Sequence, residues 1–188
     1  VPDKEDMVIA CDGGYRHGKK WGIRMDLVVG DFDSLGYLPD HLHVVRLKPE
    51  KDDTDTGYAV KTGLEKGYRE FIIYGGIGGR ISHTIANIQL LCGLAEKGCR
   101  GMLIGKDSWY RVICNEEITF DQGHTGFLSA FCMGDMAYGV YEEGLKYALC
   151  DAVLRKEYPI GVSNEFIGKE SRVSVREGTL LLVGENKE

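Results

Sequence analysis

The sequence lacks several features that would place it in common protein classes. Its 188 residues contain no apolar run of the roughly 20 residues needed to cross a bilayer. Acidic residues outnumber basic ones, 29 to 23, and no run of Lys or Arg occurs. We therefore expect neither a membrane segment nor a nucleic-acid partner. A protein with a net charge of −6 needs metal ions or local basic residues to bind an anion.

The sequence also lacks a cysteine pattern typical of metal sites or disulfide scaffolds. No C-x-x-C pair occurs among its six cysteines, which are Cys11, Cys92, Cys99, Cys114, Cys132 and Cys150. Scattered cysteines of this kind predict reduced thiols in a cytoplasmic protein. No signal peptide is visible, and because the chain starts "VPDKED" without Met, we expect N-terminal residues to be missing.

Glycine, by contrast, is abundant, and its positions punctuate an alternating pattern. The 26 glycines are about twice the usual share of ~7%. In the first ~110 residues, short apolar runs alternate with helix-like segments that begin near Thr54 and Ser82 and end near Gly67 and Lys97. The predicted strands are residues 7–11, 27–30, 44–47, 71–75 and 101–105. This alternation predicts an α/β domain with a parallel sheet.

The pattern changes after about Trp109. Seven short segments, often alternating between apolar and polar residues, follow within about 75 residues, separated by Gly or charged turns. They predict an antiparallel β-sandwich or barrel, and of these we favour a sandwich. We therefore expect an α/β domain over residues 1–111 and a β-sandwich domain over residues 112–188.

Polar motifs stand where the predicted strands end or the helices begin. They are "ACDGG" (10–14), "GDFDS" (30–34), "KDDTDT" (51–56) and "GGIGGRIS" (75–82). In open α/β sheets, ligands bind at the carboxyl ends of the strands. We therefore expect these four loops to converge on one edge of the sheet.

Asp31 and Asp33 lie two positions apart in a strand-end loop. An isolated D-x-D is also explained by turn formation or helix capping. With Asp55 in the first turn of a nearby helix, however, three carboxylates would repel one another unless a cation held them. A hard divalent ion with oxygen ligands, Mg²⁺, fits this need, because it shares its coordination between carboxylates, water and substrate phosphates.

The glycine loop "GGIGGR" supports a phosphate ligand. Its glycines let backbone N–H groups approach an anion, and the following helix adds its positive end. Arg80 supplies a cationic fork for phosphate oxygens. His83 lies beside Ser82 in the first turn of that helix, which faces the expected site. For His83, a purely structural role is as good an interpretation as a role in binding the ligand. A simple tight turn with a solvated Arg80 is the alternative for the loop as a whole.

Five motifs, in this order and at this spacing, resemble those of the thiamine pyrophosphokinase family. They are "CDGG" (11–14), "MDLVVGDFDS" (25–34), "KDDTDT" (51–56), "GGIGGRISHTIANIQLL" (75–91) and "GVSNEF" (161–166). The resemblance extends from about Ala10 to Val183. It implies a homodimer with active sites at the subunit interface. It also implies transfer of the diphosphate of ATP to the hydroxyl of thiamine, which gives thiamine diphosphate and AMP.

The resemblance also implies roles for particular residues. Asp31, Asp33 and Asp55 would be Mg²⁺-linked carboxylates and, with Arg80, catalytic. Ser163, Asn164 and Glu165 would bind thiamine. The residues implied around the nucleotide and its phosphates are Asp12, Gly13, Gly14, Ser34, Lys51, Asp52, Thr54, Gly76, Gly78, Gly79, Arg80, Ser82, His83 and Asn87.

Three positions depart from the family pattern. Ser82 stands where many members have Asp, Gly57 stands where Glu is common, and the lead before "DGG" is short. The first two changes motivate one alternative, a nucleotide-sensing module without turnover. A second alternative is a phosphatase of the haloacid-dehalogenase type, in which Asp31 would become phosphorylated. It leaves "KDDTDT" and the glycine loop without a role.

Overall fold

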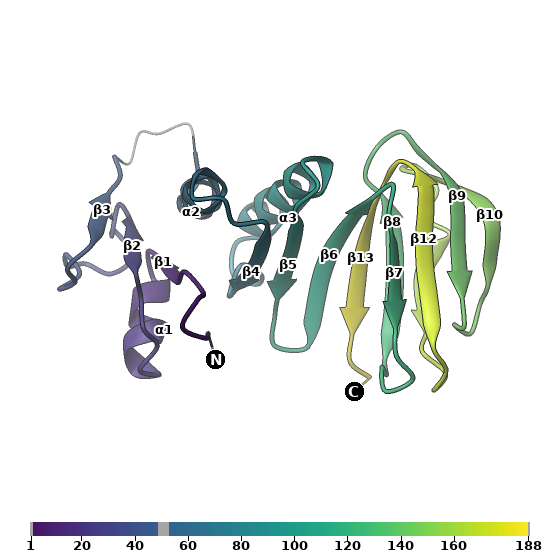
Figure 1. Ribbon diagram of the computed structural model, residues 1–188, viewed down its shortest axis with the longest axis horizontal. Helices are drawn as coiled ribbons and strands as arrows, with labels where there is room; N and C mark the ends of the chain where they lie inside the picture. Colours follow the sequence, from purple (N-terminus) through teal and green to yellow (C-terminus); the bar gives the residue numbers. More distant parts are fainter. Residues whose placement is uncertain (1, 49–52, 188) are drawn as a thin grey trace. The chain divides into compact units, whose positions relative to one another are not determined.

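A computed structural model describes residues 2–48 and 53–187 (Figure 1). The chain forms two compact units, Val1–Arg69 and Glu70–Glu188. The predicted nucleotide-binding residues Lys51 and Asp52 lie outside the described residues. No helix in the described part of the chain is long and apolar enough to span a membrane.

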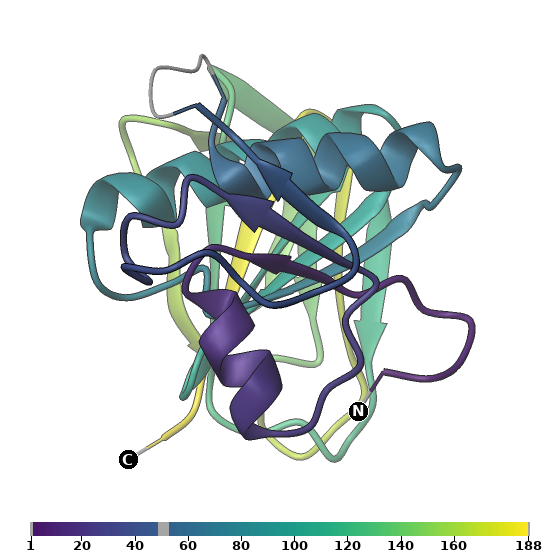
Figure 2. The same cartoon turned by 90° about the vertical axis from the view of Figure 1, so that its left-hand side faces the viewer.

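The first unit is built on a three-stranded parallel sheet in the order β1-β2-β3. Its elements are β1 (Ile9–Cys11), α1 (Gly14–Lys20), β2 (Leu27–Gly30), β3 (Val44–Arg46) and α2 (Asp55–Glu65). Figure 2 shows the three strands side by side, with α1 next to them. A small core that includes Val28, Tyr15 and Phe32 holds the sheet, α1 and the loop after β2 together. The three predicted strands of this unit are confirmed: β2 has the predicted bounds, β1 begins two residues later than predicted, and β3 ends one residue earlier.

Helix α2 follows its local signals closely. The Thr54 side chain caps its start by accepting a hydrogen bond from the Gly57 backbone N–H at 3.0 Å. After the helix ends, Gly67 takes a left-handed conformation with φ +89°, which a residue with a side chain adopts less readily. The helix lies against β1 and β2 and buries Gly57, Val60 and Gly63. Its N-terminus is therefore fixed relative to the ends of those strands.

The second unit consists of two facing sheets and one helix. The six-stranded sheet has the order β11-β8-β13-β6-β5-β4, and the four-stranded sheet has the order β10-β9-β12-β7. Strands β4 and β5 pair in parallel, and all other pairs are antiparallel. The elements are β4 (Glu70–Tyr74), α3 (Ile81–Glu96), β5 (Arg100–Ile104), β6 (Ser108–Cys114), β7 (Glu117–Phe120), β8 (Phe127–Cys132), β9 (Met136–Glu143), β10 (Leu149–Arg155), β11 (Gly161–Glu165), β12 (Ser171–Glu177) and β13 (Thr179–Glu185).

The space between the two sheets is the main hydrophobic core. Leu128, Leu180 and Leu182 enter it from the six-stranded sheet, and Val140 and Val173 enter it from the four-stranded sheet. The predicted antiparallel sandwich is thus confirmed, and so is the parallel pairing of the predicted strands in the first half. Strands β4 and β5 continue into the antiparallel sheet instead of joining β1–β3.

Helix α3 packs on β5 and β6, and its packing differs from the expected face. The apolar spacing of this segment predicts one face made of Ile85, Ile88, Leu91, Cys92 and Ala95. Leu91 is buried as predicted, but Ile85 is 54% exposed, and Leu94 is buried instead. Gly101 of β5 explains how closely the helix approaches, because a Cβ atom there would lie 2.6 Å from Leu91 and 2.9 Å from Leu94. Leu91 and Leu94 therefore fix the rotation of the helix.

Candidate functional site

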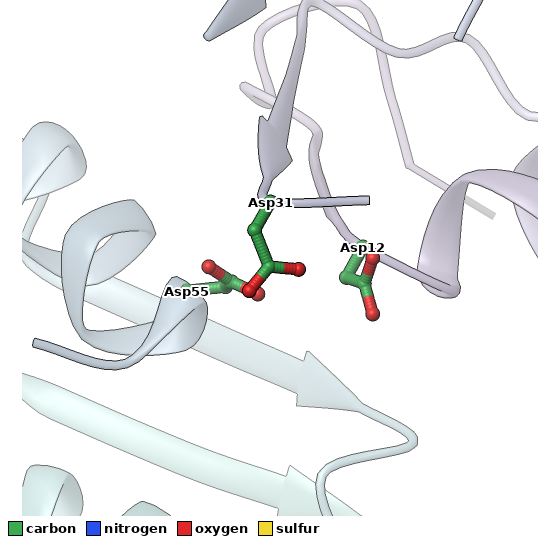
Figure 3. Close-up of side chains that lie close together, drawn as sticks. All are labelled: Asp12, Asp31 and Asp55. Atoms are coloured by element: carbon green, nitrogen blue, oxygen red, sulfur yellow. The ribbon is translucent and has the colours of Figure 1, made fainter. Parts of the chain in front are cut away.

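Three aspartates from separate segments of the first unit lie together. Asp12 follows β1, Asp31 follows β2, and Asp55 is the first residue of α2. One carboxylate oxygen from each residue lies within 4.8 Å of the others, and all three residues are half-buried. Figure 3 shows their carboxylates gathered at the ends of these three segments. We call these residues the aspartate group.

The register of the parallel strands brings Asp12 and Asp31 together. Cys11 of β1 pairs with Val29 of β2, so the loops that follow the two strands leave the sheet side by side. The backbone N–H of Asp12 continues the pairing by donating to the Val29 carbonyl at 2.7 Å. Gly30 permits this close approach, because a Cβ atom there would lie 3.2 Å from the Asp12 backbone.

Phe32 explains the spacing of the D-x-D motif. Its ring is buried in the core of the first unit, and its backbone is left-handed with φ +66°. Asp31 and Asp33 therefore flank a residue that is anchored inside. Asp31 is half-buried in the aspartate group, whereas Asp33 is exposed and donates its backbone N–H to Asp31 Oδ1 at 3.1 Å.

The aspartate group has the donor chemistry of a site for a hard divalent cation. Asp12 Oδ2 accepts a hydrogen bond from Ser34 Oγ at 2.5 Å. Its Oδ1 is buried and finds no hydrogen-bond partner anywhere in residues 2–48 and 53–187. A buried carboxylate oxygen is costly without a partner, and neighbouring carboxylates repel it. A cation bound to carboxylate oxygens, as Mg²⁺ is in proteins, would remove both costs.

The aspartate group differs in membership from the predicted metal ligands. Asp31 and Asp55 are in it as expected, and it also contains Asp12, which the sequence suggested only as a nucleotide-lining residue. Asp33 is not part of the group, and its metal role stays a prediction. The parallel pairing of β1 with β2 explains why Asp12 is in the group, because neighbouring parallel strands end at the same edge of the sheet.

The glycine loop belongs to the second unit, where it joins β4 to α3. Gly75, Gly78 and Gly79 all have positive φ, between +63° and +86°. Arg80, Ser82 and His83 are exposed, and within the described part of the chain no side chain caps the first turn of α3. The backbone N–H groups at this helix start are thus suited to an anion. Convergence of this loop with the loops of the first unit stays a prediction.

Asn87 supports the glycine loop from inside. It is 6% exposed, and its Nδ2 donates to the Gly76 carbonyl at 2.8 Å. A Cβ atom on Gly76 would lie 3.0 Å from that Nδ2. Asn87 therefore fixes the loop, and the nucleotide contact predicted for it stays a prediction.

A hollow of about 470 Å³ lies on the second unit, on the face of the six-stranded sheet that points away from the core. Residues of β8 and β13 alternate between the two faces: Leu128 and Leu182 enter the core, whereas Ser129 and Val183 line the hollow. The hollow is mostly apolar and includes aromatic side chains. Its lining residues are Tyr110, Ser129, Phe131, Met133, Val162, Ser163, Leu181, Val183 and Glu185.

The three residues predicted to bind thiamine have different environments. Ser163 lines the hollow. Asn164 is 4% exposed and hydrogen-bonded within the protein. Glu165 forms ion pairs with Lys146 and Lys187. The apolar lining of the hollow was not predicted as a site, because alternating apolar residues in a strand are equally typical of a buried sheet.

Comparison with known proteins gives a consistent result. Residues 1–103 match the family model described as "Thiamin pyrophosphokinase, catalytic domain", and residues 115–180 match "Thiamin pyrophosphokinase, vitamin B1 binding domain". A thiamine pyrophosphokinase from Bacillus subtilis (strain 168) is 27% identical over 190 residues, which cover 96% of this chain and 88% of that protein.

Solved structures agree with the fold. The crystal structure of the thiamine pyrophosphokinase from Bacillus subtilis superposes with a TM-score of 0.89 at 25% identity, covering 100% of this chain and 91% of that one. The structure of the thiamin pyrophosphokinase from Geobacillus thermodenitrificans gives a TM-score of 0.84 at 24% identity, covering 99% and 89%. At 24% identity, the similarity to the Geobacillus structure shows a shared fold and nothing more.

Proposed function

Because the chain belongs to the thiamin pyrophosphokinase family, we propose that it transfers the diphosphate of ATP to the hydroxyl of thiamine, giving thiamine diphosphate and AMP. The observation that carries the proposal is the aspartate group. Carboxylates assembled around a buried, unpartnered oxygen suit a Mg²⁺ ion that would accompany the polyphosphate of ATP.

Asp12, Asp31 and Asp55 would hold this ion. When bound, Mg²⁺ supplies positive charge that offsets the charge developing on the phosphate oxygens. The protein's own part is positioning. The loops after β1 and β2 and the capped start of α2 hold the three carboxylates close together, and this preorganisation lowers the cost of binding a metal-nucleotide complex.

The glycine loop would bind phosphate through backbone N–H groups and the exposed Arg80. This assignment is supported by the positive φ values of the loop and by the start of α3, which no side chain of residues 2–48 and 53–187 caps. The other residues proposed to line the nucleotide or its phosphates are Gly13, Gly14, Ser34, Thr54, Gly76, Gly78, Gly79, Ser82, His83 and Asn87, with Lys51 and Asp52 from the segment outside the described residues.

Thiamine would bind on the second unit, in the hollow beside Ser163. A mostly apolar hollow with aromatic residues and the carboxylate of Glu185 suits a flat, cationic heterocycle. The segment Ser163–Glu165 would contribute to this site. We also propose, from the family resemblance alone, a homodimer with active sites at the subunit interface and a cytoplasmic location.

Incubation with Mg²⁺, ATP and thiamine tests the function, with mass detection of both products. We expect thiamine diphosphate and AMP in equal amounts and only when thiamine is present. ATP binding without AMP release would instead favour a nucleotide-sensing module. A phosphorylated Asp31 formed without ATP would favour the phosphatase.

A further inference from the structure

A buried carboxyl group lies next to the segment that would bind thiamine. Glu142 of β9 is 2% exposed, and its backbone pairs with Leu149 of β10 and Val173 of β12. Its Oε2 accepts a hydrogen bond from Asn164 Nδ2 at 2.5 Å. Its Oε1 is also buried and finds no partner within residues 2–48 and 53–187. A carboxyl group buried with one hydrogen bond is costly, so its presence calls for an explanation.

The Asn164 side chain connects the Glu142 carboxyl group to the backbone of Tyr147 and of Glu165. Besides Glu142, its Nδ2 donates to the Tyr147 carbonyl at 2.6 Å. Its Oδ1 accepts from the backbone N–H groups of Tyr147 and Glu165, both at 2.9 Å. The amide thus spends both donors and its acceptor oxygen within the protein. Asn164 thus joins β11 of the six-stranded sheet to β9 of the four-stranded sheet and to the segment that connects β9 to β10.

Ser163, which precedes Asn164, has an unusual backbone conformation. Its φ is +59°, a left-handed value that costs a non-glycine residue about 1 kcal/mol or more. The pairing of β11 with β8 shifts register between Gly161 and Asn164, so Val162 and Ser163 form an irregular step in the strand. The Ser163 backbone N–H donates to Ser129 Oγ at 3.0 Å. Such irregular steps often redirect a side chain next to a functional site.

We propose that Glu142 is a positioning residue for substrate binding, acting through Asn164 to hold Ser163 in its left-handed conformation at the hollow. The inference rests on the proposed function, because it takes the hollow as the thiamine site. Glu142 orients the Asn164 amide, and Asn164 fixes the backbone on the C-terminal side of Ser163. Glu142 itself does not line the hollow. Its loss should therefore weaken thiamine binding without impairing the transfer step.

The chain offers a matched pair of variants and a conservative control. Glu142→Met keeps the length of the side chain but removes the acceptor, whereas Glu142→Gln keeps an acceptor oxygen for Asn164. Glu143→Met changes the next residue, which is exposed and accepts from Arg172 Nε at 2.7 Å. If Glu142→Met does not fold, Asn164→Ala removes the same hydrogen bond from the other side.

Steady-state kinetics with varied thiamine separate binding from turnover. For Glu142→Met we expect the KM for thiamine to rise at least tenfold with kcat within about twofold. Glu142→Gln and Glu143→Met should keep both constants within about twofold of wild type. A KM for Glu142→Met within twofold of wild type, or an equal rise in Glu143→Met, would overturn the proposal.

Amide hydrogen exchange gives a readout that does not depend on activity. We expect faster exchange at residues 163–165 in Glu142→Met than in wild type, with the rest of β11 and β8 unchanged. Unchanged exchange would refute the positioning role even in an active enzyme. If wild type instead forms no thiamine diphosphate and binds no thiamine, the proposed function fails, and the exchange comparison still decides whether Glu142 holds Ser163.

Discussion

At the residue scale, the proposed chemistry depends on the clustered carboxylates of Asp12, Asp31 and Asp55 and on the buried carboxyl group of Glu142. Asp31 and Asp55 meet as expected, because strand ends and helix starts can be located from apolar runs and capping residues. The membership of Asp12 depends on the exact register of β1 against β2 and on the missing Cβ of Gly30. Glu142 was not singled out, because a Glu beside the exposed Glu143 gives no sequence signal of its burial.

Asp31 and Asp33 provide a comparison within one motif. Asp31→Asn should lose several kcal/mol of transition-state stabilisation, about 100-fold or more in kcat/KM, because it removes a charge from the aspartate group. Asp33→Asn should lose less than about tenfold, because this residue lies outside the group. Neither variant should lower the unfolding midpoint, because Asp31→Asn only relieves repulsion within the aspartate group and Asp33 is exposed. If Asp33→Asn lowers kcat/KM as much as Asp31→Asn does, Asp33 would have to be counted among the metal ligands after all.

Glu142 also predicts a pH dependence of stability. Burial raises its pKa from the ordinary value of 4.5 to about 6, although the hydrogen bond from Asn164 acts in the opposite direction. The folded state therefore holds the proton more tightly, so stability from this proton is complete below pH 4.5 and is lost as pH rises through 6. The shift corresponds to about 2 kcal/mol.

Urea unfolding of wild type and Glu142→Gln at two pH values measures this effect. Glutamine stays neutral, so the variant should match wild type near pH 4.5 and exceed it by up to about 2 kcal/mol at pH 7.5. A difference between the two proteins that is the same at both pH values would show that the carboxyl group does not titrate in this range.

At the element scale, periodic segments were predicted well and irregular ones were missed. Helix α1 has little apolar periodicity, and only Tyr15 within it is buried. Strand β11 reads "GVSNE", and its polar residues are satisfied by distant partners such as Ser129 and Glu142. The buried face of α3 was partly wrong, because contact with β5 through Gly101, and not the apolar pattern alone, sets the rotation of the helix.

Gly161 tests how tightly β11 lies against β8. A Cβ atom there would meet the Ala130 carbonyl oxygen at 2.7 Å, and a backbone atom cannot move aside cheaply. Gly161→Ala should lower the free energy of unfolding by about 1–3 kcal/mol. In urea denaturation, Gly134→Ala is the control, because nothing lies within 4 Å of its added Cβ, and it should stay within about 0.5 kcal/mol. Equal stability of the two variants would contradict the close packing of β11.

At the scale of the whole molecule, the sequence predicted the fold class, and its net charge of −6 predicted that metal ions or local basic residues are needed to bind an anion. The predicted domain boundary between residues 111 and 112, which would separate a catalytic domain from a thiamine-binding domain, stays a prediction. Along the chain, the first compact unit ends at residue 69 and the second begins at residue 70, whereas the two family models match residues 1–103 and 115–180. Strand β6 pairs with both β5 and β13, so one sheet continues from the end of the first family match into the second.

The central claim, that the aspartate group binds the metal of a metal-nucleotide complex, is tested most directly by Mn²⁺ binding. Electron paramagnetic resonance with a non-hydrolysable ATP analogue measures the bound ion without turnover, because Mn²⁺ occupies the oxygen-ligand sites of Mg²⁺. We expect wild type and the surface variant Asp107→Asn to bind Mn²⁺ equally, and Asp55→Asn to bind it at least tenfold more weakly. Unchanged Mn²⁺ affinity in Asp55→Asn would contradict the account.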